Sequence, residues 1–473
     1  MLRARPEAIL DATLPRSWGL APNKPQTRAA RPELSNSKEI GYARRMNARD
    51  ILIGSFRAAL TAADPSTIVA PHLPNPPVSG RTVVVGAGKA SASMARAVES
   101  AWPQHAPLAG LVITRYGHGY DPQETPRRIR IVEAAHPVPD AAGETAAKEI
   151  FALARSLSEE DLLLVLMSGG GSSLMNLPEE GITTEDLRKL TRDLLASGAP
   201  IQDMNVVRKH LSRIQGGRLA ALTHARVVCL MISDVAGDDP SSIASGPTSP
   251  DLSTFQDALE ILHRFRVTPP LSIARHLSNG ARGSVRDTPK PGDPLFARVD
   301  NRVIGSAHAS LSMAAAFFQQ HGITPLVLGD TVTGEAREVA KVHAALVRQV
   351  RQHHHPFKPP VAIISGGECT VTLANAQGRG GRCSEFLLSL CIELEGAGVC
   401  AIACDTDGID GSEENAGAYM SGDTMQRARK AQLSARGLLD ANDAYGFFSA
   451  LGDLVVTGPT RTNVNDYRAI LVT

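Results

Sequence analysis

The stretch at residues 82–100, TVVVGAGKASASMARAVES, runs from a β-branched strand through a Gly-x-Gly turn into a small-residue helix. This order of elements is the outline of a dinucleotide-binding turn, in which the helix N-terminus points at phosphate. Lys89, however, follows directly after the second glycine, Gly88. The turn therefore leaves two alternatives: it holds a dinucleotide such as NAD, or its lysine acts on a phosphoryl group.

Short apolar strands alternate with longer helical stretches along most of the chain. Strands are predicted at 82–86, 110–114, 129–134, 162–167, 226–232, 302–305, 323–328, 361–365 and 399–404. Helices are predicted at 48–62, 89–100, 141–156, 184–196, 206–222, 306–319, 334–350 and 384–394. Strands that are apolar throughout are buried on both faces, as in parallel sheets covered by helices. The sequence therefore predicts the α/β class with mainly parallel sheets.

The chain divides into an extension and two domains. The segment 279–300 is rich in Gly, Pro and charged residues, and we predict that it separates a domain at 46–285 from one at 300–473. Residues 1–45 are rich in Arg, Pro, Ala and Ser with weak periodicity. We expect a disordered extension there, with Met46 as an alternative start of the protein.

The bulk composition argues against nucleic acid and membranes as partners. The formal net charge is +1 and aromatic residues make up only 4% of the chain, so neither a basic stripe nor a base-stacking platform is expected. No apolar run approaches the roughly 18 residues that a membrane span needs. The six cysteines form no CxxC pair, which indicates free thiols in a reducing compartment. We therefore expect a cytoplasmic protein.

Glycines, hydroxyls and charged residues follow five of the predicted strands directly. In open α/β sheets, ligands bind beyond the carboxyl ends of the strands. The five segments are 86–89, 168–173, 233–251, 366–368 and 405–411. Five such turns in one chain indicate a polar, anionic ligand and a divalent metal.

The motif after the strand at 162–167 is SGGGSS, made of Ser168, Gly169, Gly170, Gly171, Ser172 and Ser173. Consecutive glycines leave the backbone N–H groups unobstructed and the serines add hydroxyl donors, so this nest suits phosphate or carboxylate. The alternative is a tight strand-to-helix turn. Three glycines cost conformational entropy that a plain turn need not incur, which favours anion binding.

Two aspartates, Asp234 and Asp407, lie at or just beyond predicted strand ends. Carboxylates are hard oxygen ligands of the kind that Mg²⁺ uses beside substrate phosphates. The alternative is local turn formation through Asx hydrogen bonds. We name both residues as metal candidates.

Arg382 lies in a glycine-rich loop, NAQGRGG, just before a predicted helix. A cation at a helix N-terminus is unfavourable, and its planar fork of donors suits phosphate or carboxylate, so an anionic partner is expected. The alternative is a surface arginine paired with Glu385. Most of the basic residues of the helix at 206–222, which include Arg208, Lys209, His210 and Arg213, are expected on its solvated face.

The dinucleotide alternative meets two obstacles. Its fingerprint needs a third glycine where this chain has Ser91, and an acid after the next strand, where this chain has Arg115. Arg115 could suit the 2′-phosphate of NADP. A Walker A motif is also absent from the sequence, because Val83 and Ala90 stand at its first Gly and its Ser/Thr positions.

Taken together, the motifs resemble the glycerate 2-kinase family, which pairs a Rossmann-like N-terminal domain with a MOFRL-type C-terminal domain. The resemblance covers about residues 46–466. It rests on GAGKAS, HPVPD, SGGGSS, NVVRKHLSRIQGGRLA, SDVAGDDPSSIASGPTSPD, SGGE, GRGGRCSE, DTDGIDG and TGPTRTNVND, in this order. The set and its order are specific, although each motif alone is weak.

The resemblance implies a kinase that uses ATP and Mg²⁺ in a cleft between two α/β domains. The essential lysine and arginine of the family match Lys89 and Arg382, and positive charge beside a transferring phosphoryl group fits phosphoryl transfer. Phosphate and substrate contacts are expected from Gly86, Gly88, the SGGGSS motif, Asn205, Gly367 and Glu368. The family usually has Asn-Gln where this chain has Cys383-Ser384, and an apolar residue where it has Ser249. The first departure leaves the substrate preference open.

The resulting hypothesis is an ATP-dependent enzyme that makes 2-phospho-D-glycerate from D-glycerate, with small-molecule partners only. One rival is an NAD(P)H-dependent hydroxypyruvate reductase, a name that some relatives in this family carry. Another is a non-catalytic sugar-acid binding protein. The oligomeric state is open, with a homodimer as the candidate assembly.

Overall fold

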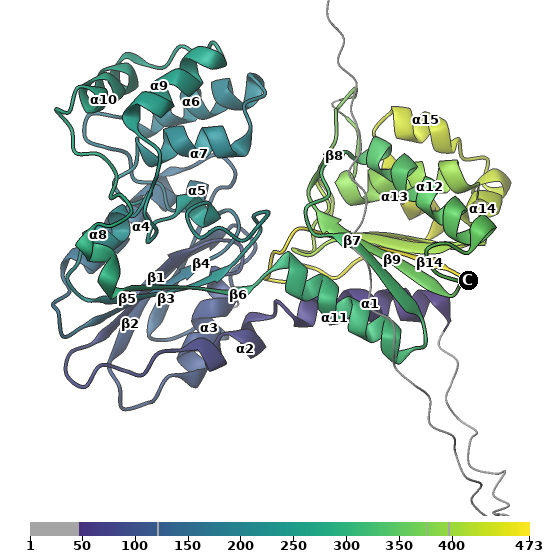
Figure 1. Cartoon of the computed structure of the whole chain (residues 1–473), viewed down its shortest axis with the longest axis horizontal. Helices are drawn as coiled ribbons and strands as arrows, with labels where there is room; N and C mark the ends of the chain where they lie inside the picture. The colour runs from purple at the N-terminus through teal and green to yellow at the C-terminus, as the bar shows by residue number, and fades with distance from the viewer. Residues whose placement is uncertain (1–46, 121–122, 376, 396–397) are drawn as a thin grey trace, which may run out of the picture. The chain divides into compact units, whose positions relative to one another are not determined.

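The computed structural model describes residues 47–120, 123–375, 377–395 and 398–473 (Figure 1). The predicted extension at 1–45 and the alternative start at Met46 lie outside these ranges. The described residues form two six-stranded sheets and one two-stranded sheet, with helices packed against them. No helix among them is both long and apolar enough to cross a membrane.

The first sheet is fully parallel and has the strand order β3-β2-β1-β4-β5-β6. Its strands are β1 (Thr82–Ala87), β2 (Leu108–Arg115), β3 (Ile129–Ala134), β4 (Leu162–Met167), β5 (Arg226–Ile232) and β6 (Val299–Gly305). The order reverses between β1 and β4, and ligands of doubly wound sheets bind at the carboxyl ends of the strands at such a switch point. The turns after β1 and β4 are the two glycine motifs of the sequence. The sequence predicted all six strands, three of them with these bounds.

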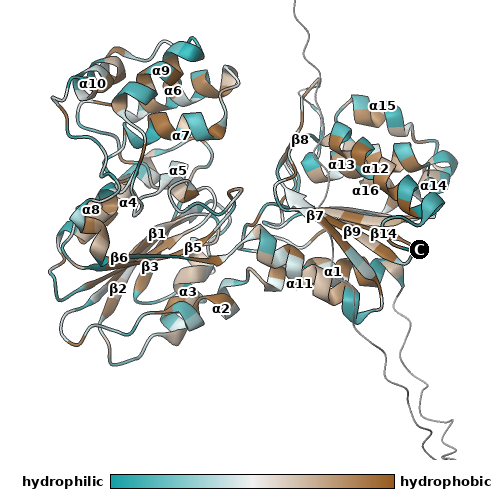
Figure 2. Ribbon diagram, viewed as in Figure 1, coloured by the Kyte–Doolittle hydropathy of each residue, from teal (hydrophilic) through white to brown (hydrophobic). Residues whose placement is uncertain are grey.

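Alternation along the strands explains why both faces of this sheet are covered. Successive side chains point to opposite faces. Leu163 and Val165 of β4 pack into one core with α4 (Ala141–Arg155), whereas Leu162 and Leu164 pack into another with α3 (Ser91–Ala101). Figure 2 shows the strands mostly brown and many helices partly teal, as a sheet between amphipathic helices requires.

A separate helical layer follows the glycine turn after β4. It has its own apolar core and is made of α6 (Thr184–Ala196), α7 (Ile201–Lys209), α9 (Phe255–Arg264) and α10 (Leu271–Ala281). The single helix predicted at 206–222 is wrong, because α7 ends at Lys209 and α8 (Arg218–Ala221) is a separate turn. The reason is local: Gly216 and Gly217 have φ of +61° and +81°, which an α-helix does not allow.

The second sheet has the order β13-β12-β11-β14-β9-β7. Its strands are β7 (Thr324–Gly329), β9 (Val361–Gly367), β11 (Cys400–Asp405), β12 (Gly417–Met420), β13 (Leu454–Val455) and β14 (Asp466–Val472). Only β7 and β9 pair in parallel, because β12 and β14 run opposite to the other four strands and lie between them. The α/β class is confirmed, but the prediction of mainly parallel neighbours fails for this sheet.

The remaining elements are α11 (Ala307–Gln320), α12 (Ala336–His353), α13 (Arg382–Leu394), α14 (Thr424–Lys430), α15 (Ala435–Asp440), α16 (Ala444–Leu451), the short helices α2 (Pro65–Ile68) and α5 (Gly171–Leu174), and the strand pair β8 (Gly334–Glu335) and β10 (Cys369–Thr370). Most of these helices pack near the second sheet, whereas α2 contacts α3 and α5 contacts β1 and β2 of the first sheet.

Two elements lie across the domain boundaries predicted at 46–285 and 300–473. β6 pairs with β5 and so completes the first sheet. The first helix, α1 (Ala48–Thr61), packs on α11, and its Leu52 and Phe56 share one core with Tyr467 of β14. From α1 onward, the described chain therefore begins at the second sheet, forms the whole first sheet, and then returns to the second.

Candidate active site

The two glycine turns of the first sheet are joined by backbone and hydroxyl contacts. The Lys89 amide donates to the carbonyl of Gly169 at 2.9 Å, and Ser168 Oγ accepts from the Ala90 amide at 3.0 Å. Gly88 has φ of +139°, and a Cβ atom there would overlap Ser168. Glycine is required at this position because the two turns touch, and the contact fixes the backbone from which the Lys89 side chain extends.

Lys89 meets an acid from the second sheet. Its Nζ donates to Asp407 Oδ2 at 2.7 Å, and the Asp407 side chain is 2% exposed. Burial alone would lower the pKa of Lys89, but Asp407, Asp405 and Asp234 outweigh burial and raise it. Burial opposes the charged form of Asp407, yet Lys89 holds its pKa below the usual range. The pair is therefore a charged lysine and a charged carboxylate.

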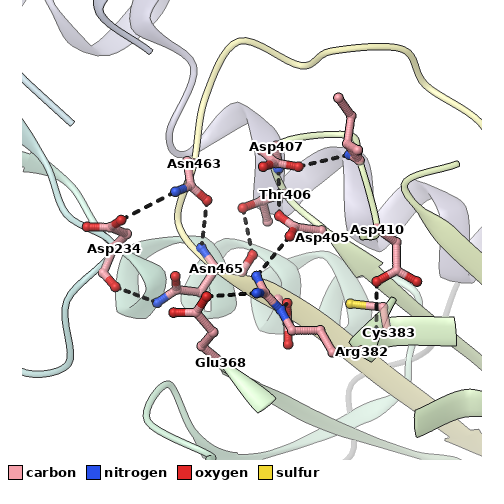
Figure 3. A network of polar contacts seen from close by, with 12 residues as sticks. Asp234, Glu368, Arg382, Cys383, Asp405, Thr406, Asp407, Asp410, Asn463 and Asn465 are labelled. Carbon is pink, nitrogen blue, oxygen red and sulfur yellow. Dashed lines mark hydrogen bonds and ion pairs between the residues drawn. The ribbon is translucent and has the colours of Figure 1, made fainter. Parts of the chain in front are cut away.

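Arg382, the first residue of α13, donates to three carboxylates (Figure 3). Its guanidinium reaches Asp466 at 2.6 Å, Glu368 at 2.7 Å and Asp405 at 2.8 Å. These acids lie at the start of β14, just after β9 and at the end of β11. The sequence predicted an anionic partner for Arg382, and in this structure three carboxylates of the same chain fill that place. The alternative partner Glu385 is wrong, because Glu385 accepts from Arg337 at 2.8 Å instead.

A chain of contacts connects the two cations. Lys89 binds Asp407, the amide of Asp407 donates to Asp405 Oδ1 at 3.0 Å, and Asp405 Oδ2 accepts from Arg382. Burial and the neighbouring Asp407 raise the pKa of Asp405 well above its usual range, against the opposing effect of Arg382. Lys89 and Arg382 are therefore brought into one site by two acids of a single loop.

Asp234, which follows β5, approaches the same site from the first sheet. Its backbone carbonyl accepts from Asn465 Nδ2 at 2.7 Å, and its Oδ2 lies 3.5 Å from Asn463 Nδ2 (Figure 3). Burial and Glu368 raise the pKa of Asp234 to about 6, whereas Lys89 opposes that shift. A Cβ at Gly169 would overlap both Asp234 and Asn463, so this glycine is required by close packing.

The two metal candidates offer oxygen donors, but they do not form a ready cluster. No group of three or more His, Cys, Asp or Glu side chains in the described ranges is arranged to hold a metal ion. Asp407 already accepts from Lys89 and, at 2.8 Å, from the amide of Ile409. Mg²⁺ needs only one or two carboxylates when phosphate oxygens and waters complete its shell. The donor chemistry of Asp234 and Asp407 therefore fits Mg²⁺.

The SGGGSS turn leads into α5 and is held by its neighbours. Gly170 has φ of +83°, and a Cβ there would lie 2.9 Å from the ring of His136. Ser172 Oγ lies 2.9 Å from Ser245 Oγ, and Ser245 Oγ donates to Asn205 Oδ1 at 3.2 Å. The structure thus joins Asn205 to the SGGGSS turn, as expected for one polar surface.

Two other predicted glycines have a structural reason. A Cβ at Gly86 would overlap the carbonyl of Leu166 on the adjacent strand. Gly367 has φ of +107°, and a Cβ there would overlap the backbone of Val332. Both glycines are explained by close backbone packing, and their contact with a ligand stays a prediction.

At Cys383 and Ser384 the chain departs from the Asn-Gln that is usual in the family, and here both side chains face the interior. Both side chains are buried, and their backbone amides donate to Asp410 at 3.0 and 2.7 Å. Asp410, from the loop after β11, therefore caps the helix that carries Arg382. This explains why the loop needs an acid there, and it assigns Asp410 a structural role.

Several site residues were missed from the sequence. Asp405 and Asp466 bind Arg382, and the signals for them were their places at a strand end and in the TNVND motif. The prediction of a solvated basic face is wrong for Lys209 and His210, which are 7% and 0% exposed. Lys209 pairs with buried Asp251 at 3.3 Å, because this side of the helix packs on the segment after β5.

Comparisons with known proteins place this site in a family. Residues 51–278 match a family model described as a domain of unknown function, DUF4147, and residues 361–466 match the MOFRL family. A relative from Agrobacterium vitis named "Putative hydroxypyruvate reductase" is 49% identical over 90% of this chain and 95% of its own length. A relative from Pyrococcus horikoshii named "Glycerate 2-kinase" is 37% identical over 84% of this chain and 88% of its own length.

The fold agrees with a solved structure. The crystal structure of a glycerate kinase from Thermotoga maritima is 36% identical and has a TM-score of 0.79, covering 89% of this chain and 99% of its own. Sequence and fold agree over nearly the whole described chain. The protein therefore belongs to the glycerate 2-kinase family.

Proposed function

We propose that the protein transfers the γ-phosphoryl group of ATP to the 2-hydroxyl of D-glycerate, giving 2-phospho-D-glycerate. The observation that carries the proposal is the contact chain from Lys89 through Asp407 and Asp405 to Arg382. Phosphoryl transfer depends on positioning and on neutralising the charge that spreads over the transferring group. Two cations held in one buried acidic site are suited to that task.

The proposed roles follow from chemistry and place. Lys89 and Arg382 donate to the transferring phosphoryl group, in exchange for carboxylate contacts that they make in this structure. The SGGGSS turn offers unobstructed backbone N–H groups to an anionic group of the substrates. Mg²⁺ would be held by Asp234 and Asp407, and when bound it neutralises phosphate charge.

A rival function is the NAD(P)H-dependent reduction of hydroxypyruvate. One observation favours it, namely that the Agrobacterium vitis relative at 49% identity carries the name of a hydroxypyruvate reductase. The β1 turn argues against it. Lys89 takes part in an ion pair with Asp407, and β2 ends at Arg115, where the dinucleotide fingerprint has an acid. A sugar-acid sensor without turnover would gain nothing from the acids around Arg382.

One assay separates the three functions. The protein is incubated with D-glycerate, ATP and Mg²⁺, and the products are identified by phosphorus NMR, beside a reaction with hydroxypyruvate and NADH or NADPH. We expect 2-phosphoglycerate and no oxidation of the reduced cofactor. 3-Phosphoglycerate would overturn the regiochemistry. Cofactor oxidation without a phosphorylated product would identify a reductase, and no reaction in either mixture would favour the sensor.

A further inference from the structure

Arg208, on α7, is a half-buried cation that lacks a carboxylate partner within the described part of the chain. Its neighbours differ: Lys209 pairs with Asp251 at 3.3 Å and Arg218 with Glu179 at 2.6 Å. The guanidinium of Arg208 instead donates to the neutral amide oxygen of Asn205 at 3.3 Å. Burial lowers the pKa of Arg208, yet a guanidinium stays charged in proteins. Removing a charge from water without an opposite charge is costly, so this half-buried environment favours the binding of an anion.

The pocket beside Arg208 carries the polar groups that such an anion needs. It is lined by Arg208, Ser172, Ser173, Gln215, Pro137 and Pro139, among others. Asn205 and Ser245 connect Arg208 to Ser172 by hydrogen bonds. Gln215 donates to the carbonyl of Ser172 at 2.7 Å, whereas its side-chain oxygen is buried without a donor among the described residues. The pocket therefore combines a cation that has no carboxylate partner with two serine hydroxyls that also hydrogen-bond within the chain. The Gln215 oxygen is an acceptor, so it suits a hydroxyl of the ligand and not its anionic group.

This pocket borders the Lys89 site through Gly170 and His136. A Cβ at Gly170 would lie 2.9 Å from the His136 ring and 3.7 Å from Lys89 Cγ. Burial, and then the positive charges of Lys89 and Arg115, lower the pKa of His136 to about 4, with a smaller contribution from Arg208. One neutral imidazole thus lies in the field of both Lys89 and Arg208.

We propose that Arg208 binds the carboxylate of the hydroxy-acid substrate, with the hydroxyls of Ser172 and Ser173 beside it. Because the planar fork of arginine matches a carboxylate with two parallel hydrogen bonds, it fixes orientation as well as charge. The carboxylate and the 2-hydroxyl are on adjacent carbons of a 2-hydroxy acid, so anchoring one directs the other towards Lys89. The inference rests on the proposed function and adds the residue that selects an acid over a neutral polyol.

The test compares Arg208→Gln and Arg208→Lys with wild type in steady-state kinetics, with D-glycerate and ATP varied separately. Arg208→Gln should raise KM for D-glycerate about 100-fold, because a buried charge partner is removed, and leave KM for ATP within about twofold. Arg208→Lys keeps the positive charge but not the planar pair of donors. Its KM for D-glycerate should therefore lie between those of wild type and Arg208→Gln. Arg192→Gln removes an exposed arginine of α6 that pairs with Glu185, and it should behave as wild type.

A second substrate tests the contribution of the carboxylate to substrate preference. Glycerol has the hydroxyls of glycerate and lacks its carboxylate, so wild type should prefer D-glycerate strongly in kcat/KM. Arg208→Gln should lose most of this preference, whereas a variant that is only destabilised would keep it. Circular dichroism and the melting temperature establish whether each variant is folded. If Arg208→Gln is not folded, the same comparison of the two substrates is made with Arg208→Lys.

The outcomes separate this inference from the proposed function. If wild type makes phosphoglycerate and Arg208→Gln keeps a normal KM for D-glycerate, the inference is overturned and the function stands. If wild type makes no product, calorimetry with D-glycerate and a non-hydrolysable ATP analogue decides. Binding that Arg208→Gln abolishes supports the carboxylate site without the kinase activity, whereas binding that survives, or no binding to wild type, overturns it.

Discussion

Lys89 and Arg382 are the two cations of the site, and their environments differ in number and origin of partners. Lys89 has one ion pair, with Asp407 from the second sheet. Arg382 has three, with Glu368, Asp405 and Asp466, and all of them come from the sheet to which its own helix packs. Lys89 therefore depends on a contact between the two sheets, whereas Arg382 is held within one.

The difference teaches how each cation can work. A single lysine ammonium can exchange one carboxylate for a phosphate oxygen with little rearrangement, because it has one partner and a flexible stem. An arginine fixed by three acids is already oriented, and its loss removes the ion-pair partner of Glu368 and Asp405, whereas Asp466 keeps Arg468. Lys89 should therefore matter mainly for turnover, and Arg382 for both turnover and folding.

The largest expected effect is on catalysis by Lys89→Met. We expect kcat to fall by about 10³- to 10⁵-fold, the range that a single transition-state cation supplies in phosphoryl transfer. The free energy of unfolding should fall by only about 1–3 kcal/mol, since one buried carboxylate loses its partner. ADP release and denaturant unfolding measure the two quantities. Lys341→Met, at an exposed pair with Glu338, is the matched control, and near-normal turnover of Lys89→Met would break the mechanism.

Arg382→Met should lose activity and stability together. Because a buried charge network is broken on one side, we expect the free energy of unfolding to fall by about 3–5 kcal/mol. Arg382→Lys restores one charge but cannot reach three acids, so it should recover only part of this loss. Denaturant unfolding of both variants beside Lys89→Met tests the comparison directly. Equal stability losses at Lys89 and Arg382 would contradict it.

A pH effect on stability is expected on the Arg382 side, through a buried histidine. His343 of α12 is buried against Phe386, bonds to Ser365 and Val339 at 2.9 Å, and lies in the field of Arg468. Burial lowers its pKa to about 4, below the ordinary value of 6.5. The unfolded chain therefore binds the proton more readily, and this contribution to stability is present above pH 6.5 and lost as the pH falls towards 4.

Between pH 7 and 4.5, wild type should lose roughly 2–3 kcal/mol more stability than His343→Gln. Denaturant unfolding at the two pH values measures this difference, with His263→Gln, at an exposed histidine of α9, as the control. Identical pH dependence in wild type and His343→Gln would show that this histidine is not held neutral by the fold.

The smallest effect is expected from Asp410→Asn. Asp410 accepts from the amides of Cys383 and Ser384 at the start of the helix that carries Arg382. The amide group keeps the shape and loses one acceptor, so the free energy of unfolding should fall by about 1 kcal/mol. A fall in kcat without any fall in stability would show that Asp410 acts in the reaction and not as a cap.

The first sheet could be predicted from the sequence because its strands are apolar throughout and each is followed by a glycine turn. The second sheet could be predicted only in part. β14 begins with Asp466 and contains Arg468, both of them buried, so its pattern does not look like a core strand. Its place between β9 and β11 is set by pairing across more than 60 residues, which local patterns do not record.

Local sequence patterns were likewise insufficient to predict every residue of the candidate site. The turn chemistry identified Lys89, Arg382, Asp234 and Asp407, because each follows a strand or opens a helix. A partner was missed where it depends on β14, as for Asp466, and the half-buried position of Arg208 was missed because it depends on packing between helices. The roles of all these residues in catalysis remain predictions that the variants above can test.

The position of α1 has a consequence for biosynthesis. Leu52 and Phe56 are synthesised long before their partner Tyr467, and Tyr467 Oη meets Ser55 Oγ at 2.8 Å across 412 residues. The first sheet can form during synthesis, while the apolar side of α1 stays without these partners until β14 has been made. Such exposed segments favour aggregation. Chaperones that shield nascent chains should therefore raise the yield of active protein, and a fragment that starts at 300 should be poorly soluble because it lacks α1.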